Sequence, residues 1–359
     1  MNNNTNLSKL MEQILASKSE VVKLGVDVHA RDLVVSVQLD GSRPQRGRRM
    51  SREQLTGLVR RLKEAGLMVY VLQEAGPCGY VLHRQLESLG AASYVMAPEV
   101  LGDARRQKTD NLDCQALADR LDRFVRGHPR AFSAVYVPTL DEEQRRAVSR
   151  LRNQLQKDRL RWEARGRSQL LSQGHHVTVR GWWRQTHWKA LCARLPHWLI
   201  QQLERMRAAI LMLDEQERQC RAQLEADVPK GVGALTWVQL QREICTWTRF
   251  TNRRQVGSAS GLCPGVHQSG GTCRHGSINR HGNPRVRHLL IELVWRLVRW
   301  QPDYPPVRRL VAGVVRGAAR RKLAVAAARR LAIDLWRLAT GRTTPEKLKL
   351  IVPAVPAHP

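Results

Sequence analysis

Residues 21–28 read VVKLGVDV, and this stretch decides the fold of the first third of the chain. It is apolar and rich in β-branched residues, so it predicts a buried strand with Asp27 near its end. Further strands and helices alternate after it: strands at residues 32–39, 67–72 and 92–96, and helices at residues 51–65 and 81–89. Such alternation indicates an α/β domain, which we place at residues 20–135.

Four carboxylates fall at the ends of these predicted elements or in the helical segment that follows Pro98. Asp27 ends the first strand, and Glu74 follows the strand at residues 67–72. Asp110 and Asp113 leave one face of a predicted helix, one turn apart. Packed together, four carboxylates would raise one another's pKa, whereas two Mg²⁺ ions would turn them into a site that acts on a phosphodiester. The alternative is a set of solvated surface acids.

The charge of the chain indicates a polyanionic partner. Lys and Arg number 60 against 31 Asp and Glu, a formal net charge of +29, and nucleic acid is the first expectation. No run of about 18 apolar residues predicts a membrane span. The first residues, MNNNTNLSKLMEQ, lack the pattern of a signal peptide, and the seven Cys include no CxxC. We therefore expect a cytoplasmic, nucleoid-associated protein without a membrane partner.

Residues 140–226 predict a long helical coiled-coil region. Two charged stretches with few helix breakers flank a Trp-rich middle, and the second carries an apolar stripe with helical spacing. The simplest architecture is two long antiparallel helices with a structural or oligomer-forming role. Alternatively, Trp182 and Trp183, beside Arg184, could stack on unpaired bases.

The last third of the chain contains a loop rich in Gly, Ser, His and Arg at residues 257–283, followed by a helix from about Pro284. Ser269 precedes two glycines, which would leave its hydroxyl accessible to a phosphate, although serines in such loops are usually structural. A zinc site is a weaker alternative, with the ligands Cys263, His267, Cys273 and His275. Gly231 and Gly233 open a helix, as a phosphate-binding turn or an ordinary one. Residues 307–340 predict a helix with an Arg face for nucleic acid.

Several motifs resemble one family. GVDVHARDLVVSV, EAGPCGYVLHRQLESLG and APEVLGDARRQKTDNLDCQALA resemble the DEDD domain of insertion-sequence transposases of the IS110/IS1111 family, which is related to the Piv DNA invertases. GLCPGVHQSGG and GSINRHGNPRVRHLL are similar to the C-terminal motif of that family. The resemblance extends over about residues 20–345. It implies a RuvC-like, ribonuclease H-like N-terminal domain and a mostly helical C-terminal serine domain at residues 227–345.

The resemblance also implies roles for individual residues. The Mg²⁺-binding catalytic carboxylates are Asp27, Glu74, Asp110 and Asp113, and the catalytic nucleophile is Ser269. The residues expected to contact nucleic acid are Lys108, Arg280, Asn283, Arg285 and Arg287. The chain departs from the family pattern in having Ala75 after the Glu, Arg280 at a Lys position and Val286 at a Leu position.

The function implied by the resemblance is that of a DNA transposase or recombinase. It would cleave and rejoin donor and target DNA through a phosphoserine intermediate, guided by a noncoding RNA of the element, as a homo-oligomer (dimer or tetramer). Two alternatives remain at this point. One is a RuvC-like metal-dependent junction nuclease that uses only the four acids, and the other is a non-catalytic RNA-binding assembly protein.

Overall fold

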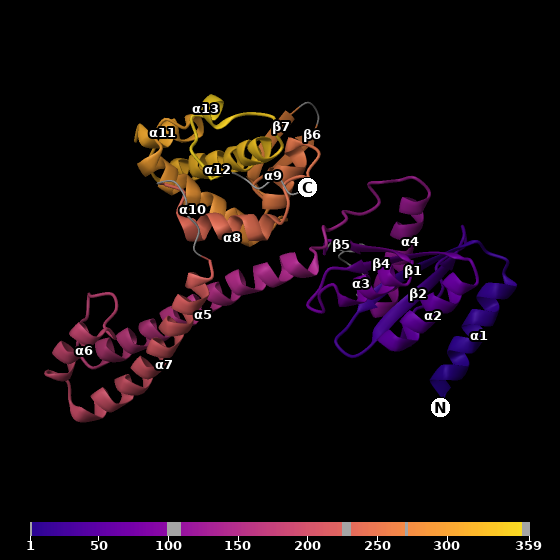
Figure 1. The fold of residues 1–359 in the computed structure, drawn as a ribbon, viewed down its shortest axis with the longest axis horizontal. Coiled ribbons are helices and arrows are strands. Elements are labelled where there is room, and N and C mark those ends of the chain that lie inside the picture. Colours follow the sequence, from indigo (N-terminus) through magenta and orange to yellow (C-terminus); the bar gives the residue numbers. More distant parts are fainter. Residues whose placement is uncertain (1, 99–108, 225–230, 270–271, 354–359) are drawn as a thin grey trace. The chain divides into compact units, whose positions relative to one another are not determined.

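The structure is a computed structural model, and it describes residues 2–98, 109–224, 231–269 and 272–353. The chain divides into two compact units, Met1–Val137 and Pro138–Pro359 (Figure 1). We call them the N-terminal unit and the C-terminal unit and describe each by itself. Among the described residues, no helix is both long enough and apolar enough to cross a membrane.

The N-terminal unit is built on a five-stranded sheet with the order β3-β2-β1-β4-β5. The strands are β1 (Val21–Val28), β2 (Leu33–Leu39), β3 (Arg48–Met50), β4 (Met68–Glu74) and β5 (Ala92–Met96). β2 is antiparallel to both β1 and β3, whereas β4 is parallel to both β1 and β5. The predicted α/β architecture is therefore confirmed, and it is consistent with a RuvC-like DEDD domain. The sequence pattern missed β3.

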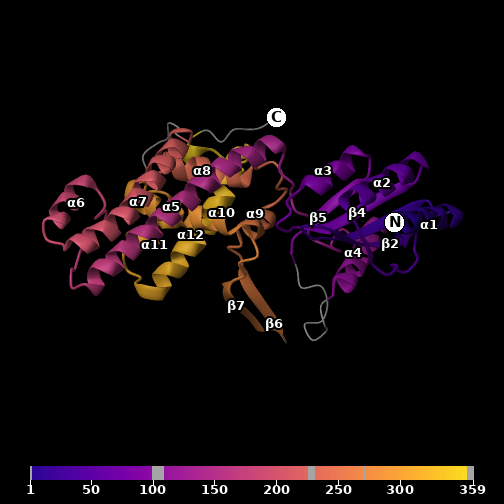
Figure 2. The ribbon, with the colours of Figure 1, turned by 90° about the horizontal axis from the view of Figure 1, so that it is seen from below.

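Helices cover both faces of this sheet. They are α1 (Asn2–Ala16), α2 (Arg52–Glu64), α3 (Val81–Ser88) and α4 (Asp110–Val125). The even-numbered side chains of β1, from Val22 to Val26, belong to the core that includes α1, α2 and α3. The opposite face lies under α4, and Figure 2 shows α2 and α3 on one side of the sheet and α4 on the other. β1 is thus covered on both faces, with Val22, Leu24 and Val26 facing α1–α3 and Lys23, Gly25 and Asp27 facing α4.

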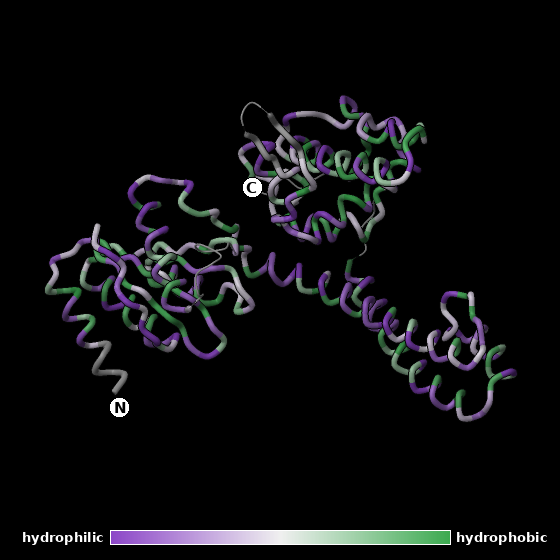
Figure 3. The backbone as a smooth tube through the Cα atoms, turned by 180° about the vertical axis from the view of Figure 1, so that it is seen from behind, coloured by the Kyte–Doolittle hydropathy of each residue, from purple (hydrophilic) through white to green (hydrophobic). Residues whose placement is uncertain are grey.

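The first part of the C-terminal unit is a helical hairpin. It consists of α5 (Leu140–Ser172), α6 (Gln185–Cys192) and α7 (His197–Ala222), and α5 packs along α7. Figure 3 shows hydrophilic residues along most of α5, with apolar residues at intervals. The two predicted long helices are confirmed, while the coiled-coil assembly stays a prediction.

The Trp-rich middle of this hairpin is a small core and not an exposed platform. Trp182 is 0% exposed and Trp183 5% exposed, and Trp188 is equally well buried. Trp182 occupies the space above Gly166, where a Cβ would lie 2.1 Å from its ring. Base stacking by Trp182 and Trp183 is therefore wrong as an interpretation, because both rings are already used in packing. Trp198, by contrast, is 46% exposed.

The second part of the C-terminal unit is a helical domain with one β-hairpin. Its elements are α8 (Ala234–Ile244), α9 (Arg253–Ser260), β6 (Pro264–Ser269), β7 (Thr272–Ile278), α10 (Pro284–Trp300), η1 (Pro305–Val307), α11 (Arg308–Val311), α12 (Gly317–Ala339) and α13 (Pro345–Leu348). The core lies mainly between α8, α10 and α12. Residues 257–283, expected as a loop, instead end α9 and form the β6–β7 hairpin. The helix expected over residues 307–340 is interrupted near Gly313, whose φ of 67° does not fit a right-handed helix.

Candidate active site

α4 packs on one face of β1, where every second residue of the strand contacts the helix. A Cβ on Gly25 would lie 2.1 Å from the backbone oxygen of Cys114, so only glycine lets α4 approach this closely. Two residues earlier, Lys23 Nζ lies 2.7 Å from Asp122 Oδ1 near the other end of α4, and both side chains are buried. Residues two apart share a strand face, so Asp27 lies on this face too, under the beginning of α4.

The first turn of α4 presents two of the predicted acids. The helix begins at Asp110, and Asp113 lies one turn further along. Thr109 is the N-cap, and its hydroxyl accepts a hydrogen bond from the backbone N–H of Leu112 at 3.4 Å. The N-terminal end of a helix carries partial positive charge and favours carboxylates. The backbone therefore stabilises negative charge where the site needs it.

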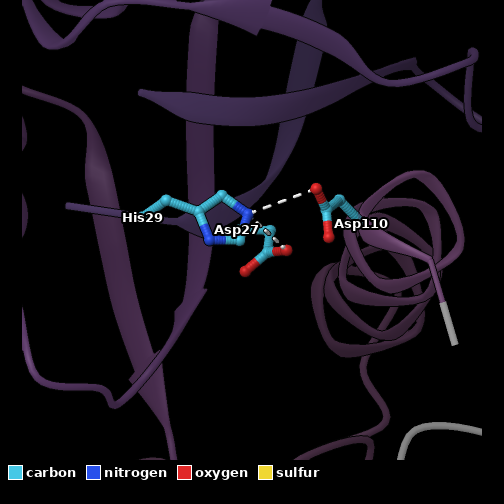
Figure 4. Close-up of side chains that lie close together, drawn as sticks. All are labelled: Asp27, His29 and Asp110. Carbon is cyan, nitrogen blue, oxygen red and sulfur yellow. Dashed lines mark ion pairs between the residues drawn. The ribbon is translucent and has the colours of Figure 1, made fainter. Parts of the chain in front are cut away.

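Asp27, His29 and Asp110 come together in what we call the Asp27–His29–Asp110 cluster (Figure 4). His29 Nε2 lies 3.3 Å from Asp27 Oδ2 and 3.5 Å from Asp110 Oδ2. One ligand atom from each residue falls within 4.8 Å of the other two. Carboxylate and imidazole donors at such separations fit a divalent metal ion. The three side chains are 22%, 41% and 45% exposed, so a substrate can reach them.

A cation lies at the rim of this cluster. Arg49, on β3, has Nη2 at 3.6 Å from Asp110 Oδ2 and Nη1 at 3.4 Å from Asp32 Oδ2. Its side chain is 72% exposed, and an ion pair so exposed contributes little to stability. The guanidinium can therefore leave the carboxylates and bind a phosphate without loss of fold.

Glu74 lies beside the cluster by backbone position. β1 and β4 run parallel, and the register that pairs Val26 with Gln73 brings Asp27 to the level of Glu74 on the neighbouring strand. Neighbouring strands are about 4.8 Å apart, and residues at one level in parallel strands share a face. The side chains of Asp27 and Glu74 thus belong to the sheet face that α4 covers.

Burial and the negative charge of this region raise the pKa of the Cys114 thiol. Burial, followed by the charge of Asp27 and then that of Asp113, raises the pKa of Cys114 from 9.0 to about 11. A single buried thiol therefore lies within electrostatic range of an acid on β1 and an acid on α4. Asp113 follows Asp110 by three positions in α4, so the two acids lie on the same side of the helix, one turn apart.

In the C-terminal unit, two of the predicted nucleic-acid contacts have partners within the fold. Asn283 is the N-cap of α10, with Oδ1 accepting from the backbone N–H of Arg285 at 2.9 Å, and its Nδ2 donates to Glu243 Oε2 at 3.0 Å. Arg287 Nη1 donates to the backbone oxygen of Ser260 at 3.3 Å. Arg280 and Arg285 are exposed, and Arg280 has a φ of 61°.

Glu243 anchors this region. It is 4% exposed, and Arg150 binds it with two hydrogen bonds of 2.9 and 3.0 Å. Burial pushes the pKa of Glu243 up, but the hydrogen bonds from Arg150 and Asn283 outweigh burial and leave the pKa below its ordinary value. The Gly-Asn-Pro motif therefore has a structural use. Gly282 reinforces this, since a Cβ there would lie 2.2 Å from the backbone nitrogen of Gly261.

Two predicted site residues lie in or next to stretches outside the described residues. Lys108 falls in the undescribed stretch 99–108. The backbone of Ser269 ends β6 and pairs with Thr272 of β7, but its side chain is not among those described. The same is true of His267, Cys273 and His275 of the zinc alternative, which therefore stays a prediction.

Sequence reasoning missed three residues of this site: Gly25, His29 and Arg49. His29 follows Asp27 by two positions, and the D-x-H spacing is the signal that could have revealed it. Gly25 interrupts a strand rich in valine, which indicates a close backbone approach. Arg49 gave no usable signal, because its position depends on the unpredicted strand β3.

Comparison with known proteins agrees with this geometry. A model of the family described as "Transposase IS116/IS110/IS902 family" matches residues 228–307. A second model, of DEDD transposases of the IS110 type, described as "Transposase", matches residues 24–174. The chain belongs to the IS116/IS110/IS902 family of transposases. The four acids fall within the second match, and Ser269 and the residues from Arg280 to Arg287 fall within the first.

Relatives in this family carry matching names. "Putative transposase y4rJ" of Sinorhizobium fredii is 32% identical over 262 residues, which cover 65% of this chain and 66% of that protein. "Putative transposase y4qE" of the same organism is 30% identical over 253 residues, covering 66% of this chain and 60% of that protein. The chain thus spans less than two thirds of the length of each of these two relatives. "Probable family 20 transposase" of Pseudomonas aeruginosa is 25% identical over 316 residues, covering 82% and 90%.

Proposed function

We propose that this protein is a DNA transposase that cleaves and rejoins DNA at the ends of an insertion sequence. Ser269 is the nucleophile, and Asp27, Glu74, Asp110 and Asp113 are the carboxylates that bind Mg²⁺. The observation that carries the proposal is the Asp27–His29–Asp110 cluster, where the end of β1 meets the first turn of α4. The net charge of +29 supports a nucleic-acid substrate.

Each group has a defined chemical task. When bound, Mg²⁺ would polarise a phosphoryl oxygen and stabilise charge on the leaving oxygen. Asp27 and Asp110 would hold the ion at the phosphate that reacts, and Arg49 neutralises a non-bridging oxygen of that phosphate. Ser269 Oγ attacks the phosphorus and gives its proton to water. The bond from phosphorus to the departing DNA oxygen breaks, and that oxygen takes up a proton from water.

Rejoining reverses this step with a DNA hydroxyl as the attacking group, which releases the serine. The scheme requires Ser269 and the carboxylates to act on the same phosphodiester, within one chain or between subunits of a dimer or tetramer. We further propose that a noncoding RNA of the element selects donor and target DNA by base pairing. RNA that copurifies with the protein, and loss of target choice after ribonuclease treatment, are the expected results.

The main experiment detects DNA covalently bound to the protein. The full chain, element-end DNA, candidate RNA and Mg²⁺ are incubated, denatured and digested, and the phosphopeptide is mapped by mass spectrometry. We expect an adduct at Ser269 that Ser269→Ala abolishes and that Ser277→Ala, on β7 of the same hairpin, preserves. Asp110→Asn should abolish both adduct and cleavage.

Two outcomes would favour the alternatives. Cleavage at an unchanged rate by Ser269→Ala would indicate a nuclease that uses the acids alone. Full transposition by Asp110→Asn in cells would indicate a protein whose role is binding or assembly, without chemistry at this site.

A further inference from the structure

His29 lies inside the acidic site although it is not one of the four carboxylates. Its Nε2 is directed at both Asp27 Oδ2, at 3.3 Å, and Asp110 Oδ2, at 3.5 Å (Figure 4). Nε2 is shielded from solvent and, among the described residues, has no hydrogen-bond partner of acceptable geometry. A shielded polar atom without a partner costs free energy, so this position is better explained by a partner that is not a side chain.

The spacing of the three donor atoms suits a single ion. Ligand atoms at right angles around an ion, each about 2.1 Å from it, lie about 3.0 Å apart. The two separations that involve His29 Nε2, 3.3 and 3.5 Å, are only slightly longer, and all three ligand atoms lie within 4.8 Å of one another. All three side chains are partly exposed and can adjust, so a small inward movement would bring two carboxylate oxygens and one nitrogen onto the same ion.

We propose that His29 Nε2 is a ligand of the ion bound by Asp27 and Asp110, and that this nitrogen shifts the metal preference of the site from Mg²⁺ toward Mn²⁺ or Co²⁺. Mg²⁺ strongly prefers oxygen ligands, whereas imidazole binds transition metals more tightly along the series from Mn²⁺ upward. The inference rests on the proposed function, because it assumes that these carboxylates bind a divalent ion. It adds the identity of a ligand and a consequence for which metal the protein selects.

The test measures metal binding and not DNA cleavage. The metal-free full chain is titrated with Mn²⁺ while free Mn²⁺ is followed by electron paramagnetic resonance, and Mg²⁺ affinity is obtained by competition. His29→Ala should weaken Mn²⁺ binding about tenfold or more, and Mg²⁺ binding much less. His128→Ala is the matched control, since this exposed histidine belongs to the same unit, and it should bind both metals as the unaltered chain does.

A spectroscopic signature supplies an independent measurement. With Mn²⁺ bound, electron spin-echo modulation should show coupling to a ring nitrogen, and His29→Ala should lose it while His128→Ala keeps it. Circular dichroism and thermal unfolding of His29→Ala should be unchanged, because the side chain is 41% exposed and contributes little to the core.

The outcomes separate two levels of failure. One outcome would rule out His29 as a ligand and leave the proposed function standing. In it, Asp27→Asn abolishes metal binding, but His29→Ala changes the affinities for Mn²⁺ and Mg²⁺ by the same factor. Absence of the nitrogen coupling from the unaltered chain would have the same meaning. In that case His29 is an ion-pair partner of the two carboxylates. If neither variant weakens binding, the acidic site does not bind metal, and the proposed function fails with this inference.

Discussion

Gly25→Ala tests how the acidic site is held together. The new Cβ would lie 2.1 Å from the backbone oxygen of Cys114 and 2.5 Å from the backbone nitrogen of Ala118. Both atoms belong to the α4 backbone and cannot rotate away, so α4 must move outward by about 1.3 Å to restore an ordinary contact of 3.4 Å. Overpacking of this kind costs about 1–3 kcal/mol of unfolding free energy. A displacement of about 1 Å at a catalytic group lowers a rate about a hundredfold.

The assay pairs stability with function. Chemical denaturation should give a lower unfolding free energy for Gly25→Ala, and its rate of DNA cleavage should fall about a hundredfold under conditions where the variant stays folded. Gly57→Ala is the control, because Gly57 lies within α2 and a Cβ there meets no atom within 4 Å. The unfolding free energy of Gly57→Ala should rise by about 1 kcal/mol, and its rate of DNA cleavage should be unchanged. Unchanged stability and cleavage by Gly25→Ala would refute the close packing of α4 on β1.

Three further substitutions test other contacts of the fold. Lys23→Ala removes one of two cations from the buried Asp122, since Arg126 Nε stays 2.9 Å from Oδ2, and should lower the unfolding free energy by about 1.5–3 kcal/mol in urea denaturation; no measurable loss would show that the pair is dispensable. Asp27→Asn removes a negative charge next to Cys114, so alkylation of that thiol should begin at lower pH than in the unaltered chain; an unchanged pH profile would contradict the charge effect. Trp182→Ala should cost about 3–5 kcal/mol, measured by thermal unfolding, and a small loss would mean that its core is not formed.

The Cys114 thiol also makes a signed contribution to the pH dependence of stability. Its pKa in the fold, about 11, lies above the ordinary 9.0. A raised pKa means that the folded state holds the proton more tightly than the unfolded state does. The stabilisation is therefore complete below about pH 9 and is lost as the pH rises toward 11. Cys114→Ala should flatten the stability profile in that window and leave it unchanged at neutral pH.

Local patterns predicted most of the N-terminal unit. The predicted strands at residues 21–28 and 92–96 coincide with β1 and β5, because each is a short, mainly apolar segment of strand length. Helix α2 begins one residue after Ser51, whose capping box with Gln54 is visible in the sequence. β3 has three residues, two of them Arg, and it exists only because β2 offers it an edge. No window of sequence carries that information.

The acidic site was only partly predictable for the same reason. The order of Asp27, Glu74, Asp110 and Asp113 along the chain suggested a shared site, because each lies at or near the end of an element. Their proximity depends on the register of β1 with β4 and on the height of α4 above the sheet, and neither is a local property. The β6–β7 hairpin was also missed, since its Gly- and His-rich strands lack the alternation of apolar residues.

The acidic site and the buried ion pair of the N-terminal unit are two ends of one contact. Lys23 and Asp27 are four residues apart on β1 and therefore about 13 Å apart. On α4, which runs the opposite way, Asp113 and Asp122 are nine residues and therefore about 14 Å apart. The two lengths match, so the pairing of Lys23 with Asp122 fixes which turn of α4 faces Asp27. A shift of α4 by one turn, about 5.4 Å, would leave the buried Lys23 without its partner and would also move Asp110 away from Asp27, so one helix position serves both the ion pair and the proposed metal site.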